Sequence, residues 1–190
     1  MGNNVLKYFL NNIVDQAWTD KYIKTFISLA GPWGGSVVAA KGLASGYNMG
    51  MPQYLVHSLE LRQVLRSWSS THFLMPSAEL WSKDEFIMST VNKNYSIHDI
   101  EAFFNDVNFT EGYQQYQKAK EGTTFDPPGV DIHCIYTLSQ PTTSVMMWGE
   151  GQWPDTQPAD GYGGGDLSVN ARSLEYCKKW IGNNKEKEVS

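Results

Sequence analysis

The chain has 190 residues, of which 41% are hydrophobic and 18% charged, and its formal net charge is −5. This composition is typical of a folded domain with its own hydrophobic core rather than of a disordered chain. The acidic balance excludes nucleic acid as a partner, because a phosphate backbone requires clustered Lys and Arg. No apolar run approaches the roughly eighteen residues that span a bilayer. The opening residues, MGNN, also lack the basic and apolar regions of a signal peptide.

The first predicted elements are a helix and a strand. Residues 2–14 place apolar side chains four positions apart, which predicts an amphipathic helix with this face: Val5, Phe9 and Ile13, flanked by Leu6 and Leu10. Residues 22–30 form a short apolar run that ends at Gly31 and Pro32, and this run predicts a buried strand. A helix followed by a strand fits one half of an α/β unit.

The middle of the chain, residues 33–128, predicts an inserted cap and lid rather than further βα repeats. Residues 42–52 combine glycines, methionines and a proline, which indicates a flexible apolar loop. Residues 58–68 predict a short helix, and residues 97–104 predict another that begins after the N-cap Ser96. The cap is therefore expected to be mainly helical.

The last part of the chain, residues 129–182, predicts a return to the α/β core. Residues 130–138 have strand character, and residues 169–181 are weakly helical. Residues 141–165 are rich in Gly, Pro, Trp and polar side chains, so they predict a loop. The polar residues 183–190 predict a flexible tail. The resulting expectation is an α/β fold with a core formed by residues 1–32 and 129–182.

A search for catalytic motifs yields one candidate acid. The sequence contains no G-x-S-x-G and no H-E-x-x-H, and its four histidines lack metal-ligand spacing, so no metal site is predicted. Asp166 lies in the segment GGGDLSVN of residues 163–170. The glycines let the backbone turn sharply, and a carboxylate there can be aimed inward from a rigid scaffold. Asp166 can equally serve as the cap of the following helix, and the residues alone leave both interpretations open.

The cysteines and two glycosylation sequons bear on the compartment. Cys134 and Cys177 lie 43 positions apart with no C-x-x-C motif. They can form a disulfide or remain two inert buried thiols, and composition slightly favours the thiols. Asn94 and Asn108 each begin an N-x-[ST] sequon. Because such tripeptides also arise by chance, each gives only weak support for a secretory route.

Several uncommon motifs occur in a fixed order along the chain: ISLAGPWGGS at 27–36, LASG at 43–46, PGV at 128–130, HCIY at 133–136 and GDLSV at 165–169. Together they resemble the lecithin:cholesterol acyltransferase and lysosomal phospholipase A2 family, and the resemblance extends to about Trp180. It implies a partial α/β-hydrolase fold with an inserted helical cap and lid.

The resemblance also implies roles for individual residues. Met1 corresponds to the residue after the family's nucleophilic serine, and its backbone N–H would belong to the oxyanion hole. Asp166 corresponds to the acid of the Ser-Asp-His triad, and Leu167 stands where the family has a glycine. Cys134 and Cys177 match a disulfide pair of the family, and Asn94 matches a sequon position. The serine and histidine are absent, so the chain as given is expected to be inactive.

For the whole enzyme the resemblance implies a serine-dependent lipid O-acyltransferase or phospholipase A. Its substrates would be phospholipids and lipid alcohols, reached by transient contact with a membrane or lipoprotein surface in a secreted, lysosomal or vacuolar lumen. No cofactor is implied. Two alternatives remain: a non-catalytic lipid-binding remnant whose gene starts at Met1, and a cytosolic structural domain that shares only composition.

Overall fold

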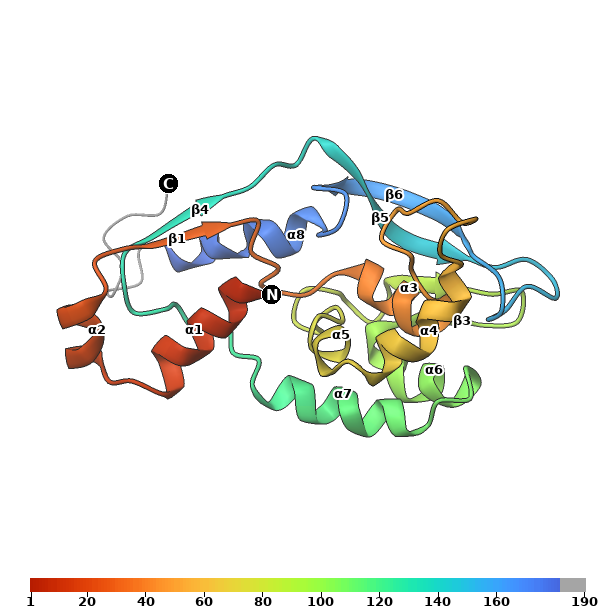
Figure 1. Cartoon of the computed structure of the whole chain (residues 1–190), viewed down its shortest axis with the longest axis horizontal. Coiled ribbons are helices and arrows are strands. Elements are labelled where there is room, and N and C mark those ends of the chain that lie inside the picture. The colour runs from red at the N-terminus through yellow and green to blue at the C-terminus, as the bar shows by residue number, and fades with distance from the viewer. Residues whose placement is uncertain (182–190) are drawn as a thin grey trace.

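A computed structural model describes residues 1–181. At one end of the molecule, strands β1 (Phe26–Leu29) and β4 (Ile132–Ile135) pair in parallel, with Phe26 opposite Ile132 and Leu29 opposite Ile135. The helices at this end are α1 (Gly2–Asn12), α2 (Gln16–Tyr22), α8 (Ala171–Leu174) and the 3-10 helix η2 (Glu175–Trp180) (Figure 1). The N-terminus lies near the middle of the molecule, next to the remaining helices (Figure 1).

A second, four-stranded sheet has the order β3-β2-β5-β6. Its strands are β2 (Phe86–Ser89), β3 (Asn94–Ser96), β5 (Gln140–Met147) and β6 (Ala159–Gly165). Strands β2 and β5 are parallel, whereas the two outer pairs are antiparallel. The helices at this end are α3 (Val37–Ser45), α4 (Ser58–Ser67), α5 (Ser69–Phe73), η1 (Ile97–Asp99), α6 (Ile100–Asp106) and α7 (Glu111–Glu121). The chain is thus a mixed α/β protein, as predicted.

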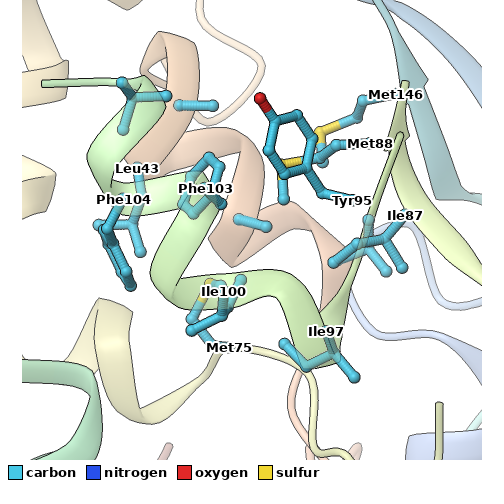
Figure 2. Packing of buried hydrophobic residues seen from close by; sticks show 14 of the residues in the cluster. Leu43, Met75, Ile87, Met88, Tyr95, Ile97, Ile100, Phe103, Phe104 and Met146 are labelled. Atoms are coloured by element: carbon cyan, nitrogen blue, oxygen red, sulfur yellow. The ribbon is translucent and has the colours of Figure 1, made fainter. Parts of the chain in front are cut away.

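Two buried clusters hold these elements together. The larger one joins α3 and α6 to the second sheet, and Figure 2 shows Leu43, Phe103 and Phe104 packed near Met88 and Met146. The smaller cluster surrounds the β1–β4 pair and contains Leu10, Phe26, Ile132, Trp33 and Trp180. The ring centroids of Trp33 and Trp180 are 4.9 Å apart. These two clusters position the loops between them.

The helix predicted over 97–104 is confirmed by its cap. The Ser96 hydroxyl accepts the His98 backbone N–H at 3.2 Å, and the Asp99 carboxylate accepts the Ser96 N–H at 2.9 Å. This capping box satisfies two backbone donors that a helix start would leave unpaired. The helix predicted over 58–68 is confirmed as α4.

The prediction of a loop over 141–165 was wrong for residues 141–147 and 159–165, and only residues 148–158 between them lie outside strands. Strands β5 and β6 form an antiparallel hairpin there, with Gln140 opposite Gly165 and Met147 opposite Ala159. The β6 sequence, ADGYGGG, shows no apolar alternation because most of its residues are exposed or half-buried. Its strand conformation comes from pairing with β5, which a local pattern does not reveal.

The first 30 residues also differ from the prediction. Tyr22 ends helix α2 rather than beginning a strand, and β1 is buried on only one face, because Ile27 and Leu29 are 60% and 64% exposed. Helix α1 buries Asn4 and Lys7 beside Leu10, whereas Val5 is 56% exposed. Tertiary hydrogen bonds explain why Asn4 and Lys7 lie on the buried face of α1. The side-chain amide of Asn4 donates to Pro32 O at 3.0 Å, and the Lys7 ammonium donates to Thr124 O.

The predicted tail over 183–190 lies outside the described residues. Among residues 1–181, no helix is long and apolar enough to cross a membrane.

Candidate active site

The acid candidate Asp166 lies in the turn between β6 and α8. Its Oδ1 accepts the backbone N–H groups of Ser168 at 3.0 Å and Val169 at 2.7 Å. One carboxylate oxygen therefore bonds within the turn. The N-cap of α8 is Asn170, so the interpretation of Asp166 as the cap of the following helix was wrong. The hydrogen bonds found among residues 1–181 leave Oδ2 for another partner. Bonding within the turn through Oδ1 is thus compatible with a catalytic role of Oδ2.

The glycine that precedes this acid is required by close backbone approach. A Cβ atom at Gly165 would lie 2.3 Å from the carbonyl oxygen of Val169 and 2.4 Å from Thr142 Oγ1, so no larger residue fits. Leu167, which directly follows the acid, has a φ of +83°. A left-handed conformation is costly for a residue with a Cβ atom. The turn therefore has the shape that a glycine would favour, although leucine occupies it.

Side chains from distant segments hold the turn in place. The Leu167 N–H donates to Thr142 Oγ1 at 2.9 Å, and the Ser36 hydroxyl donates to the carbonyl oxygen of Ser168. The Asn170 side chain is 4% exposed. Its Nδ2 donates to Thr143 O at 2.8 Å and, at 3.5 Å, to Ser144 Oγ, and its Oδ1 accepts the Val37 N–H at 3.1 Å. The turn is consequently tied both to strand β5 and to the start of helix α3.

Sequence reasoning did not identify these anchors. Ser36 precedes the apolar run of α3 and caps that helix by accepting the Val38 N–H at 3.2 Å. A serine before an apolar run is a recognisable N-cap signal, and Asn170 stands in the same position before α8. Neither signal indicates that Ser36 bonds to Ser168, or that Asn170 bonds to Val37, across the molecule.

A cavity of about 350 Å³ borders this turn. Met1 lines this cavity, and so do Ser168 and Val169 of the acid turn. Most of the other lining residues are apolar: Ala30, Pro32, Val38, Ala39, Gly42, Tyr47, Met49, Leu65, Trp68 and Leu74. Because an apolar cavity favours an apolar occupant, its lining suits a hydrocarbon chain.

The two cysteines belong to the buried cluster around the β1–β4 pair. Cys134 on β4 and Cys177 in η2 are both buried, and both are present as thiols. A hydrogen bond from Cys134 is the main cause that lowers the pKa of the Cys177 thiol. The two residues are thus close enough to interact directly, and their pairing as a disulfide stays a prediction.

The sequon asparagines are both exposed. Asn94 begins β3, which is an edge strand of the second sheet. Asn108 has a φ of +52°, and asparagine tolerates this conformation better than most residues, which gives it a structural reason to be there. Glycosylation at either position stays a prediction.

The histidines provide no metal site among the described residues, where no group of His, Cys, Asp or Glu could hold an ion. His72 is fully buried, and its ring lies 6.0 Å from that of Phe104. Burial lowers the pKa of His72, while a hydrogen bond to Trp68 O at 3.0 Å partly opposes this. His72 therefore belongs to the core rather than to the candidate site.

Comparison with known proteins decides the family. The sequence matches the family described as lecithin:cholesterol acyltransferase over residues 1–124 and 110–190. The chain belongs to this family. Among its relatives, a phosphatidylcholine-sterol acyltransferase of Gallus gallus is 40% identical over 98% of this chain. Lysosomal phospholipase A and acyltransferase proteins of Bos taurus and Homo sapiens are 38% and 37% identical over 100% and 95% of this chain.

The chain is shorter than these members of the lecithin:cholesterol acyltransferase family. It spans 45% of the Gallus gallus protein, 46% of the Bos taurus protein and 43% of the Homo sapiens protein. The relatives are enzymes that transfer or release acyl groups, as their names state. The activity of the whole protein to which this chain corresponds is therefore a matter for proposal.

Proposed function

We propose that residues 1–190 form the acid-bearing and chain-binding part of a serine-dependent lipid O-acyltransferase or phospholipase A. The observation that carries this proposal is the apolar cavity that Met1 shares with Ser168 and Val169, beside Asp166. A carboxylate, a candidate oxyanion donor and a chain-binding cavity then meet at one place. These are parts that ester cleavage through an acyl-enzyme requires.

In this proposal the remainder of the whole enzyme supplies the nucleophilic serine and the histidine. Asp166 Oδ2 accepts the Nδ1–H of the histidine and holds its ring, while Oδ1 stays bonded to the turn. The histidine takes the serine proton as the serine oxygen attacks the ester carbonyl of a phospholipid. The backbone N–H of Met1 stabilises the negative oxygen of the tetrahedral intermediate, whose collapse expels the lysolipid alcohol with the proton from histidine. Water or a lipid alcohol then takes the acyl group from serine.

We further propose the architecture and setting that this chemistry implies. Residues 1–32 and 129–182 belong to an α/β-hydrolase core, and residues 33–128 form its cap, with the lid at residues 44–56. Cys134 and Cys177 form a disulfide, Asn94 and Asn108 carry glycans, and the protein works in a secreted, lysosomal or vacuolar lumen. The exposed Met49, at 57%, lies where a lid would touch a membrane or lipoprotein surface.

The test compares residues 1–190 with the whole enzyme on vesicles of phosphatidylcholine that carry a labelled acyl chain. The whole enzyme should release labelled fatty acid, or transfer the label to an added lipid alcohol, through a labelled acyl-serine intermediate. Residues 1–190 alone should do neither. A whole protein that binds the vesicles but forms no acyl-serine would instead support the non-catalytic lipid-binding alternative.

A further inference from the structure

Helix α3 forms one wall of the apolar cavity. Val38, Ala39 and Gly42 line it, and these positions share a helix face because they are three or four residues apart. Leu65 of α4 and Thr71 of α5 also line it. The cavity is therefore bordered by α3 and by the α4–α5 pair.

The two ends of this wall differ in their distance from the acid turn. Ser36, which bonds to Ser168, lies at the start of α3, and Gly42 lies six positions further along the helix. At the rise of an α-helix, six residues correspond to about 9 Å. Gly42 thus faces the part of the cavity that is remote from the proposed reacting ester.

Gly42 is unusual because nothing in its backbone requires glycine. It lies inside α3 with ordinary helical geometry, whereas Gly46 at the end of the helix has a φ of +75°. Glycine is disfavoured inside helices. A Cβ atom at residue 42 would lie 3.2 Å from Leu65 Cδ1 and 3.9 Å from Thr71 Cγ2, and both side chains line the cavity. A side chain at residue 42 therefore presses directly on two residues that line the cavity.

We propose that Gly42 is a specificity-determining residue that sets how long an acyl chain the cavity admits. This inference rests on the proposed function, in which the cavity receives the acyl chain. A side chain at residue 42 occupies the remote part of the cavity and pushes on Leu65, which is itself a wall. Long chains then lose burial there, whereas short chains, held near Met1 and Ser168, do not.

Binding to the full 190-residue chain tests the inference without catalysis. The assay measures how well octanoate, laurate and palmitate displace a fluorescent fatty acid from the wild type and from the variants Gly42→Ala and Gly42→Val. Gly2→Ala is the control, because a Cβ atom at residue 2 meets no atom within 4 Å. Gly42→Val should weaken palmitate binding about fourfold for each methylene that is excluded, and leave octanoate binding within about twofold. Gly42→Ala should give a smaller change of the same kind, and Gly2→Ala none.

Equal losses for all three fatty acids, or no loss in either Gly42 variant, would overturn the inference. If circular dichroism shows that Gly42→Val does not fold, the fatty-acid binding of Gly42→Ala tests the inference instead. A wild-type chain that binds no fatty acid also overturns it. The proposed function fails separately, when the whole enzyme turns over neither short nor long esters although the fatty-acid binding pattern holds. In an active whole enzyme, Gly42→Val should lower the ratio of kcat/KM for palmitoyl over octanoyl esters.

Discussion

Replacing Asn170 by alanine should loosen the acid turn and destabilise the whole chain. The asparagine side chain is 4% exposed and bonds at once to the N–H of Val37 and the carbonyl oxygen of Thr143. The Val37 N–H belongs to the first turn of α3, where helical donors have no partner within the helix. Asn170→Ala therefore leaves one buried donor and one buried acceptor unsatisfied.

The magnitude follows from those two groups. Each buried unsatisfied polar group costs about 1–3 kcal/mol, so Asn170→Ala should lower the free energy of unfolding by about 2–6 kcal/mol. For a chain of this size, such a loss corresponds to a fall in Tm of roughly 5–20 °C. Val37 and Thr143 are 0% and 6% exposed, so bulk water does not readily replace the lost partner.

Urea denaturation followed by circular dichroism measures this effect, with Asn92→Ala as the matched control. The Asn92 side chain is exposed, and only its backbone forms a hydrogen bond, to Thr90 Oγ1. The control should change the free energy of unfolding by less than about 0.5 kcal/mol. A loss in Asn170→Ala no larger than in the control would refute the idea that Asn170 anchors the turn.

Three further changes test other features. In secreted material, Cys134→Ser should lower the free energy of unfolding by about 4 kcal/mol in the chain-entropy model; peptide mapping that finds both cysteines alkylated without reductant would contradict the disulfide. Leu167→Gly should leave this free energy unchanged or raise it by up to about 1 kcal/mol, because it relieves the φ of +83°, whereas Leu138→Gly should lower it. Burial lowers the pKa of Lys120 from 10.5 to about 7. Between pH 7 and 10.5 the Lys120 side chain is therefore protonated in the unfolded chain and neutral in the folded one, so the free energy of unfolding should rise with pH over this range. In urea titrations at several pH values, Lys120→Met should reduce this rise to the part that Lys7 contributes, because burial lowers the pKa of Lys7 to about 8, and the exposed Lys118→Met should keep the whole rise.

Local sequence signals predicted the elements that depend on local interactions. Ser96 and the residues after it contain their own cap, and the apolar residues of α4 recur at helical spacing, so both helices were confirmed. The hairpin of β5 and β6 was missed because its glycine-rich strand β6 depends on pairing with a neighbour. The buried face of α1 was missed because Asn4 and Lys7 are drawn inward by partners at residues 32 and 124.

In the candidate site, too, the sequence predicted what depends on local residues and missed what depends on contacts between distant segments. Asp166 was singled out from its glycine-rich turn and from the family resemblance, and two residues of that turn line the same cavity as Met1. Its anchors Ser36 and Asn170 could not be paired from the sequence, because more than 130 positions separate them. Hydrogen bonds across such distances exist only once both buried clusters have formed.

The central claim is that Asp166 is the catalytic acid of an acyl-transferring enzyme, and one steady-state comparison tests it most directly. The whole enzyme, its Asp166→Asn variant and the control Asp84→Asn, whose aspartate is exposed, are assayed on phosphatidylcholine vesicles after circular dichroism has shown equal folding. Asp166→Asn should lower kcat about ten-thousandfold, because the histidine would lose its productive tautomer, while Asp84→Asn should keep full activity. Unchanged turnover in a folded Asp166→Asn enzyme would contradict the claim and place the acid elsewhere.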